Sequence, residues 1–284
     1  MDGTVGIVVP PFPDPIKPDH VMQPFSIGVL AAALALATAP ATAGEAIGRI
    51  SDDIAITANQ TAGALSTVSG DIHLQAKAHS RSLTTVSGDV RLADGAVAGN
   101  ATTVSGDVDG GQGVQLKDVE TVSGDVELGH QARTGAITTV SGDVRVGTDS
   151  HLAAVQTVSG DVFVDRRGQV ARGIDTVSGA VGLVGSRVGG DVVTVTGNVT
   201  VGVGSHVRGG MRVRKPNQTS GGSMINIGLK PVPPRIVIGP QAVVDGALVF
   251  EHPVKLYVHR TARTGAIQGA TAIAFDTPTP PRDP

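Results

Sequence analysis

The sequence predicts an all-β fold, a single-stranded parallel β-helix (β-solenoid) built from 18-residue coils. The tetrapeptide Thr-Val-Ser-Gly occurs seven times, with its threonines at positions 67, 85, 103, 121, 139, 157 and 176. The interval between successive threonines is therefore 18 in five cases and 19 in the last. Such a constant spacing is typical of a unit that stacks on copies of itself, and a unit of this length matches one coil of a β-solenoid.

Alternation of apolar and polar residues identifies this unit as a β-strand with its return path. In residues 85–92, the apolar Val86, Val90 and Leu92 share one parity with Gly88, and the polar residues share the other. One face of the segment is therefore expected to be buried and the other exposed. Valine, threonine and glycine also disfavour a helix. Each strand is expected to pair with its equivalents in the neighbouring coils, about 4.8 Å away.

Equivalent residues of stacked coils form columns, whose positions we number from the motif threonine as position 1. The columns at positions 2, 6, 8 and 17 are apolar and are expected to form the core, with Gly110 as one gap at position 8. The members are Val68, Val86, Val104, Val122, Val140, Val158 and Val177 at position 2, Ile72, Val90, Val108, Val126, Val144, Val162 and Val181 at position 6, Leu74, Leu92, Gly110, Leu128, Val146, Val164 and Leu183 at position 8, and Leu83, Ala101, Val119, Ile137 and Val155 at position 17.

The repeat extends beyond its perfect copies and predicts the domain boundaries. Counting back one coil places Ile50, Ile54, Ile56 and Leu65 at the four core positions, and residues 194–199 form a softened eighth copy. We expect ten or eleven coils. The predicted parts are a solenoid at 44–214, a Pro/Gly-rich loop at 215–235, C-terminal coils or a cap at 236–276, and a disordered tail at 277–284.

Residues 1–43 are predicted to be an N-terminal extension and a signal peptide, with translation starting at Met22. An apolar run at 27–39 precedes Ala41-Thr42-Ala43, the small residues that a signal peptidase requires. The run is shorter than the roughly 20 apolar residues that cross a bilayer. The alternative, a buried helix, is disfavoured because the first coil begins only a few residues later. We therefore expect an exported protein in the periplasm, on the outer-membrane surface or outside the cell, and not an integral membrane protein after signal cleavage.

Composition narrows the classes of function. The chain has no cysteine, which excludes disulfides, thiol catalysis and thiolate metal sites. Without residues 1–43 it carries 22 acidic and 21 basic residues, a net charge near −1 that argues against nucleic-acid binding. It has no tryptophan, one tyrosine and five phenylalanines, which are too few for a platform that stacks sugars or bases.

The repeated Thr-Val-Ser-Gly-Asp-Val, with an apolar residue two positions later, resembles the bacterial adhesin-like β-solenoid domains. The resemblance covers about residues 49–211. Two later segments, 238–246 and 264–269, resemble the coils of bactofilins, the polymer-forming bacterial β-helix proteins, but their Gly-x-x-Ala-x-Val-x-Gly pattern is common to many solenoids. The first resemblance implies an exported β-helix, right-handed or left-handed, and leaves its biochemical role open.

An aspartate column at position 5 provides the candidate metal ligands. Adjacent charges about 4.8 Å apart repel by about 0.9 kcal/mol in bulk water. Two interpretations explain how the protein offsets this repulsion. In the first, each aspartate caps backbone N–H groups at the bend, and Arg91 and Arg145 balance the charge. In the second, the column binds calcium or another hard cation, although the denser Gly-Gly-x-Gly-x-Asp spacing is missing. The column consists of Asp71, Asp89, Asp107, Asp125, Asp143 and Asp161.

Two further patterns have competing interpretations. The threonine and serine columns at positions 1 and 3 form either ordinary hydroxyl ladders or the flat hydroxyl lattice of an ice-binding solenoid. His79, His151 and His206 share position 13. They are three to four coils apart, too far for one metal, and are expected to be surface residues.

The leading expectation is a non-enzymatic, structural or adhesin-like element that presents a repetitive Thr/Ser/Asp face to a cell-envelope or surface partner or to copies of itself. No residue is assigned a catalytic or cofactor-binding role, and calcium is the one cofactor considered. One alternative is a calcium-binding solenoid module. Others are an ice-binding protein and a carbohydrate-active β-helix enzyme centred on the 215–235 loop, whose Lys215, Lys230 and Arg235 form a cationic cluster.

Overall fold

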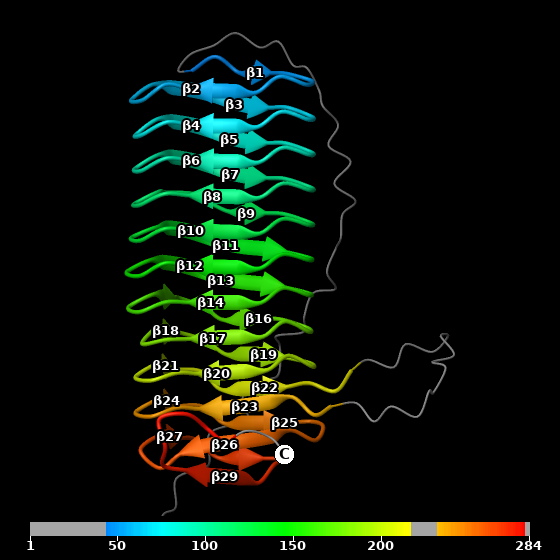
Figure 1. Ribbon diagram of the computed structural model, residues 1–284, viewed down its shortest axis with the longest axis vertical. Helices are drawn as coiled ribbons and strands as arrows, with labels where there is room; N and C mark the ends of the chain where they lie inside the picture. Colours follow the sequence, from blue (N-terminus) through cyan, green and yellow to red (C-terminus); the bar gives the residue numbers. More distant parts are fainter. Residues whose placement is uncertain (1–43, 217–231, 282–284) are drawn as a thin grey trace, which may run out of the picture. The chain divides into compact units, whose positions relative to one another are not determined.

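The computed structural model describes residues 44–216 and 232–281, in which every regular element is a β-strand. The chain winds through about twelve stacked coils, more than the ten or eleven expected, with parallel pairing between equivalent strands (Figure 1). Ile72 pairs with Val90, and Val90 pairs with Val108, so each residue meets its equivalent in the next coil. The predicted β-solenoid is therefore confirmed. Residues 1–43, which include the predicted signal peptide, lie outside the described residues.

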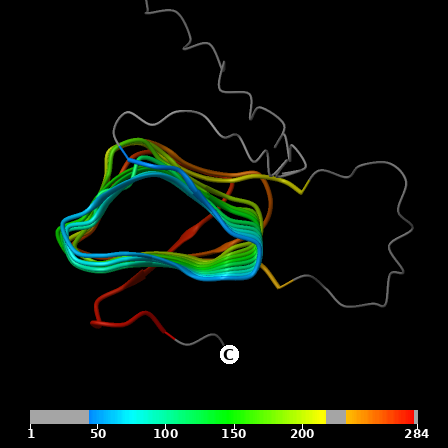
Figure 2. The ribbon, with the colours of Figure 1, turned by 90° about the horizontal axis from the view of Figure 1, so that it is seen from above.

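Three walls and three corners make up each coil, as the view along the stack shows (Figure 2). The first wall is a 12-stranded parallel sheet formed by positions 6–8. Its strands are β2 (Ile54–Ile56), β4 (Ile72–Leu74), β6 (Val90–Leu92), β8 (Val108–Gly110), β10 (Val126–Leu128), β12 (Val144–Val146), β14 (Val162–Val164), β17 (Val181–Leu183), β20 (Val199–Val201), β23 (Arg235–Ile238), β26 (Lys255–His259) and β29 (Ala272–Phe275).

The other two walls form a 17-stranded sheet. The single longer interval of the repeat arises here, because Leu152 pairs with Val170 at the regular spacing, whereas Val155 pairs with Ile174 after one inserted residue. The strands are β1 (Ile47–Gly48), β3 (Thr61–Ser66), β5 (His79–Thr84), β7 (Val97–Thr102), β9 (Val119–Glu120), β11 (Arg133–Thr139), β13 (His151–Thr157), β15 (Gln169–Val170), β16 (Ile174–Asp175), β18 (Arg187–Val188), β19 (Val192–Thr194), β21 (His206–Val207), β22 (Met211–Val213), β24 (Val243–Val244), β25 (Leu248–Phe250), β27 (Arg263–Thr264) and β28 (Ile267–Gln268).

The core confirms the predicted columns at positions 6, 8 and 17, apart from the gap at Gly110, and adds columns at positions 12 and 14. Ile72, Leu74 and Leu83 are each completely buried. Position 12 holds small residues such as Ala96 and Ala132, and it changes to Val114 in the coil that carries the gap. A methyl group placed on Gly110 would approach Val114 Cγ2 to 2.9 Å. Val114 therefore fills the space that a larger residue at position 8 occupies in the neighbouring coils.

The prediction that position 2 belongs to the core is wrong. The motif threonines are buried, Thr103 and Thr139 completely, whereas Val122 is 37% exposed and the other motif valines are half-buried. Ile50, the corresponding residue of the first coil, is 68% exposed. The physical reason is that Thr-Val-Ser-Gly forms a corner and not a strand, so the inside-outside alternation of the following strand does not extend back through it.

A hydrogen bond from glycine to threonine closes this motif corner. The N–H of Gly106 donates to Oγ1 of Thr103 over 3.0 Å, and the N–H of Gly124 donates to Oγ1 of Thr121 over 3.1 Å. Glycine is required because successive corners approach closely: a methyl group on Gly124 would overlap the carbonyl oxygen of Gly106. The prediction that the motif glycine forms a bend is correct, and the close contact between neighbouring coils is the reason why this residue is glycine.

A second corner, at position 11, places one residue of each coil in the left-handed conformation. Gly95 and Gly113 have φ of 69° and 68°, and the equivalent Lys77, Gln131 and Arg167 have φ of 58–59°. The left-handed region is costly for residues with a Cβ. Because the residue type varies at this position, the sequence pattern did not reveal the corner.

The C-terminal strands continue the same sheets. β23 pairs with β20 and β26, and β26 pairs with β29. Val237, Tyr257 and Phe275 form a separate small cluster, and the ring of Phe275 meets that of His259 edge-on at 5.0 Å. Among the described residues, no helix is long and apolar enough to cross a membrane.

Candidate functional site

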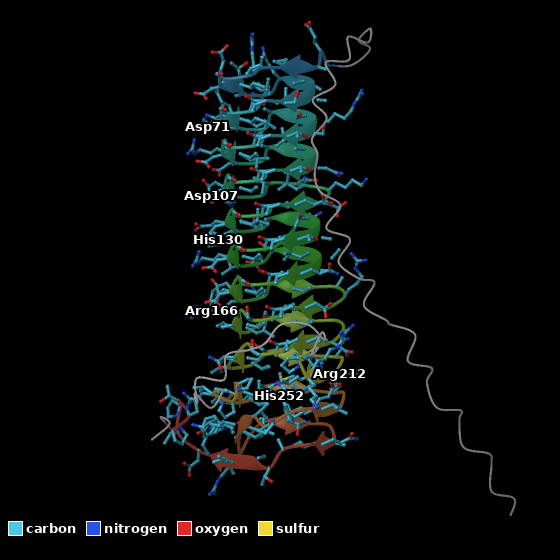
Figure 3. All side chains as sticks on the ribbon, turned by 90° about the vertical axis from the view of Figure 1, so that its right-hand side faces the viewer. Asp71, Asp107, His130, Arg166, Arg212 and His252 are labelled. Atoms are coloured by element: carbon cyan, nitrogen blue, oxygen red, sulfur yellow. The ribbon has the colours of Figure 1, made fainter. Side chains whose placement is uncertain are left out.

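The aspartate column lies at the edge of the first wall, where each member directly precedes a strand. Asp71 precedes β4 and Asp161 precedes β14. Parallel pairing brings equivalent residues of neighbouring coils to about 4.8 Å apart, and Figure 3 shows Asp71 and Asp107 on the same side of the stack. The structure therefore brings all six predicted aspartates into one row.

Each carboxylate of the row accepts a hydrogen bond from the next coil. The N–H of Asp89 donates to Oδ1 of Asp71 over 2.9 Å, and the N–H of Asp107 donates to Oδ1 of Asp89 over 3.0 Å. The same bond repeats through Asp161, which accepts from Ala180 over 2.7 Å. A charged acceptor strengthens such a bond. This is the capping role of the first interpretation, with the donors supplied by the equivalent residue of the next coil.

The row begins one coil earlier than the motif indicates. Oδ1 of Asp53 accepts the N–H of Asp71 over 2.8 Å. Asp53 lies one 18-residue repeat before Asp71, so the spacing alone could have identified it, although its coil lacks the motif. We call the row from Asp53 to Asp161 the aspartate ladder. Its function in the fold is to hold successive coils in register.

Two arginines reduce the repulsion within the ladder, as expected. Arg91 contacts Asp71 at 2.5 Å and Asp89 at 2.6 Å, and Arg145 contacts Asp143 at 2.7 Å. The N–H of Asp89, and then the guanidinium of Arg91, lower the pKa of the Asp71 carboxyl. The hydrogen bond with Asp71 in turn raises the pKa of Arg91. These pairs are exposed, so each one alone contributes little to stability.

Between the two arginines, four carboxylates from adjacent coils lie together. Asp107 and Asp125 belong to the ladder, and Asp109 and Glu127 follow them on the outer face of β8 and β10. Partial burial, and then the charge of Asp107, raise the pKa of Asp109. An open groove of about 340 Å³ is lined by Asp109 and Glu127 together with Arg91 and Gly110. The arginines reach this group only at longer range, Arg91 at 4.0 Å from Asp109 and Arg145 at 3.8 Å from Asp125.

The geometry leaves cation binding as a prediction. Oδ1 of each ladder aspartate accepts a backbone N–H, which leaves Oδ2 for a ligand or an arginine. Among residues 44–216 and 232–281, no three His, Cys, Asp or Glu side chains converge as a metal site. The ladder aspartates are thus a row of single carboxylates, and a cation would have to bridge neighbouring coils.

The threonine and serine columns have opposite orientations. The threonines are buried and accept hydrogen bonds from the corner glycines, whereas serines such as Ser87 and Ser123 are exposed. The expected outward Thr/Ser/Asp face therefore consists of serine and aspartate, with half-buried valine between them. An ice-binding lattice of two hydroxyl rows is not present at this corner.

The histidines occupy one column, as predicted, but are well separated. Gln115 and Arg133 are among the residues between His79 and His151, and Gln169 and Arg187 lie between His151 and His206. Nε2 of His206 lies 2.7 Å from Oδ2 of Asp245. No pair of these histidines meets, which agrees with their interpretation as surface residues.

The cationic cluster of the 215–235 loop is only partly visible. Lys230 and the rest of residues 217–231 lie outside the described residues. The N–H of Lys215 donates to Oε2 of Glu251 over 3.0 Å. The guanidinium of Arg235 lies 4.9 Å from the centre of the Tyr257 ring and donates to the carbonyl oxygen of Pro281. Arg235 belongs to β23, so the predicted loop ends one residue earlier.

Comparison with known proteins adds no family to this picture. No family model matches the chain, and no curated protein or solved structure is significantly similar to it.

Proposed function

We propose that the protein is an exported, non-enzymatic β-solenoid, a structural or adhesin-like element of the cell envelope or surface. The observation that supports this proposal is the repetition of one outward face on six successive coils. In each of these coils an exposed serine precedes a ladder aspartate, as in Ser87 and Asp89 or Ser123 and Asp125. Such a face offers a partner many identical contacts at the coil spacing of about 4.8 Å.

The conformation of the chain supports a rigid element. The ladder, the threonine corners and the parallel sheets all join each coil to its neighbours, and the core runs without interruption from Ile54 to Leu256. Solenoids of this kind combine a fixed shape with an extended surface. The small-x-small residues Ala41 and Ala43, close to the first coil, support export.

Fractionation of native host cells tests this function. We expect the protein in the envelope or the medium, with an N-terminus near residue 44 after signal cleavage. A second assay would measure binding of the purified protein to isolated envelopes, with wild type compared with a variant that carries Asp107→Asn and Asp125→Asn. Asparagine keeps the backbone-capping oxygen, so weaker binding would report the lost charge. An uncleaved protein confined to the cytoplasm would refute the proposal.

Cation binding is the second candidate, favoured by the four carboxylates between Arg91 and Arg145. If calcium bridges neighbouring coils there, it stabilises the folded state by mass action. Calcium titration followed by thermal melting would then show a rising Tm, and Asp109→Asn combined with Glu127→Gln would abolish the rise. An unchanged Tm in millimolar calcium removes this candidate.

A further inference from the structure

The motif valines form a continuous apolar ridge on the surface of the solenoid. We call this row the valine ridge. Seven of its members are half-buried and Val122 is exposed. Eight coils spaced by about 4.8 Å give a ridge about 34 Å long. Its members are Val68, Val86, Val104, Val122, Val140, Val158, Val177 and Val195.

The surroundings of the valine ridge resemble those of an interface. Exposed serines at position 3 run beside it, and the eight motif corners contain no charged residue. An apolar strip with a polar border is the typical anatomy of a protein interface. A row of aliphatic side chains that remains partly exposed indicates an interaction surface.

Charge along the stack is strongly asymmetric. Residues 44–148, which contain the first six strands of the first wall, carry 7 basic and 13 acidic residues, a net charge of −6. The described residues from 149 to 281 carry 12 basic and 8 acidic residues, a net charge of +4. Figure 3 shows Asp71 and Asp107 towards one end of the stack and Arg212 towards the other.

This asymmetry is also present directly beside the valine ridge. The column next to it on the first wall begins with the aspartate ladder, continues through Ala180 and Asn198, and ends in Arg235 and Lys255. The ridge itself is followed, one coil after Val195, by Arg214. The flank is therefore acidic along six of the eight ridge coils, neutral along the last two, and basic only in the coils that follow the ridge.

We propose that a second copy of this chain packs antiparallel against the valine ridge. In a parallel pair, the acidic halves would lie side by side and repel each other. In an antiparallel pair, the half with net negative charge lies beside the half of its partner with net positive charge, and ladder aspartates oppose each other in four coils instead of six. The two-fold axis crosses the middle of the ridge. The equal coil spacing lets the valines of one copy pack between those of the other. This inference rests on the proposed structural function and specifies self-association as its form.

Single cysteines test the arrangement, because the natural chain has none. Ser87→Cys and Ser178→Cys lie five coils apart on the ridge border, about 24 Å, and Ser123→Cys lies near the middle. With a cross-linker shorter than this separation, we expect the Ser87 and Ser178 variants to cross-link to each other when mixed, but not to themselves. The Ser123 variant is expected to cross-link to itself. Ala76→Cys, exposed at a different corner, is the negative control.

Other cross-linking patterns overturn the proposal. Self-cross-linking of all three ridge variants would show a parallel pair, and no cross-linking would show that the ridge is free. Light scattering provides an independent measurement: Val122→Lys is expected to convert a dimer to a monomer, while Thr200→Lys, exposed on the first wall, leaves the dimer intact. Both substituted residues are exposed, so both variants are expected to fold, and the Tm of Val122→Lys should equal that of the wild type at concentrations where the wild type is monomeric. A wild-type monomer at all concentrations contradicts the proposal.

The two proposals fail separately. A monomer found in the envelope fraction would overturn the antiparallel pair and leave the exported structural function standing. An antiparallel dimer that remains in the cytoplasm without signal cleavage would do the reverse.

Discussion

The motif threonine acts inside its corner, where the hydroxyl replaces a backbone acceptor. Seven of the eight threonines at this position accept the N–H of the glycine three residues later. Thr139 differs, because its buried Oγ1 has no hydrogen-bond partner among the described residues. One residue type at one position therefore occurs with and without its hydrogen bond in the same molecule.

Replacing these threonines by valine separates the hydrogen bond from packing. Thr103→Val leaves the buried N–H of Gly106 without an acceptor, so we expect a loss of about 1–2 kcal/mol in the free energy of unfolding. Thr139→Val replaces an unpaired hydroxyl with a methyl group of similar volume, and this change is expected to be neutral or stabilising. Chemical denaturation measures both. Equal losses for the two variants would contradict the role of the hydroxyl.

The left-handed corner at position 11 allows a test of backbone strain alone. Gly113 has φ of 68° and open space where a Cβ would lie. Gly113→Ala is therefore expected to cost roughly 1–2 kcal/mol through its backbone conformation. Gln131→Gly, at the same position one coil later, relieves that strain and is expected to stabilise by up to about 1 kcal/mol. Thermal melting should show a lower Tm for Gly113→Ala and a higher Tm for Gln131→Gly. Changes of Tm in the same direction would refute the assignment of backbone strain to this corner.

At the scale of the element, the aspartate ladder combines hydrogen bonds with electrostatic repulsion. Its hydrogen bonds require an oxygen acceptor but no charge, as Asn198 shows by accepting the N–H of Arg235 over 2.8 Å. The charge is favourable at Asp71, beside Arg91, and unfavourable at Asp109, where its carboxyl is partly buried near Asp107. The net contribution of a carboxylate to stability thus differs between the ladder and the neighbouring outer face of the first wall.

Stability as a function of pH is expected to distinguish these two carboxyls. The pKa of Asp71 is lowered in the folded protein, so its charge stabilises above the unfolded pKa of about 3.9, and that contribution is lost as pH falls through the folded value. Asp71→Asn should therefore destabilise at neutral pH. The pKa of Asp109 is raised, so Asp109→Asn should stabilise at neutral pH. Both differences should vanish in strong acid, and shifts of the same sign at pH 7 would contradict this.

At the scale of the whole molecule, stability is a sum of contacts between neighbouring coils. The glycine of the motif corner fixes their separation, because a methyl group on Gly124 would overlap the carbonyl oxygen of Gly106. Damage at one interface is therefore expected to stay near that interface rather than to spread to both ends of the stack.

Hydrogen exchange can measure how far such damage extends. Gly124→Ala is expected to lower amide protection in the coils next to residue 124 and to leave the most distant coils close to wild type. Gly182→Ala is the matched control, because the nearest atom to its added methyl would belong to the outer Phe163 ring, at 3.2 Å, and no backbone atom would overlap it. Uniform loss of protection along the chain would instead indicate a single cooperative unit.

Regular spacing made most of the fold predictable. The columns led by Ile72, Leu74 and Leu83 follow from the constant period of the repeat and from the alternation of a strand, and the structure buries them. The exposure of Val122 was not predictable, since it depends on the corner formed by its neighbours. The left-handed corner at Gly113 and Gln131 left no constant residue to detect.

The candidate site was predictable in composition and only partly in geometry. The aspartates and the balancing Arg91 and Arg145 are readable from their positions in the repeat. The direction of the hydrogen bonds, from each coil to the preceding carboxylate, required the structure. The pairing of Val114 with Gly110 likewise depends on contacts between two columns that the sequence places four residues apart.

Because the register between coils is constant, the length of this molecule can change without a change in its core or its surface. Val90, Val108 and Val126 occupy the same column, so removal of residues 90–107 would bring Ile72 against a residue of the same type as before. The rod would shorten by one step of about 4.8 Å and keep its walls, corners and outer face. A deletion of half a coil would instead place polar residues in the core. Evolution or a designer can thus change the reach of this protein in whole coils, without inventing a new surface.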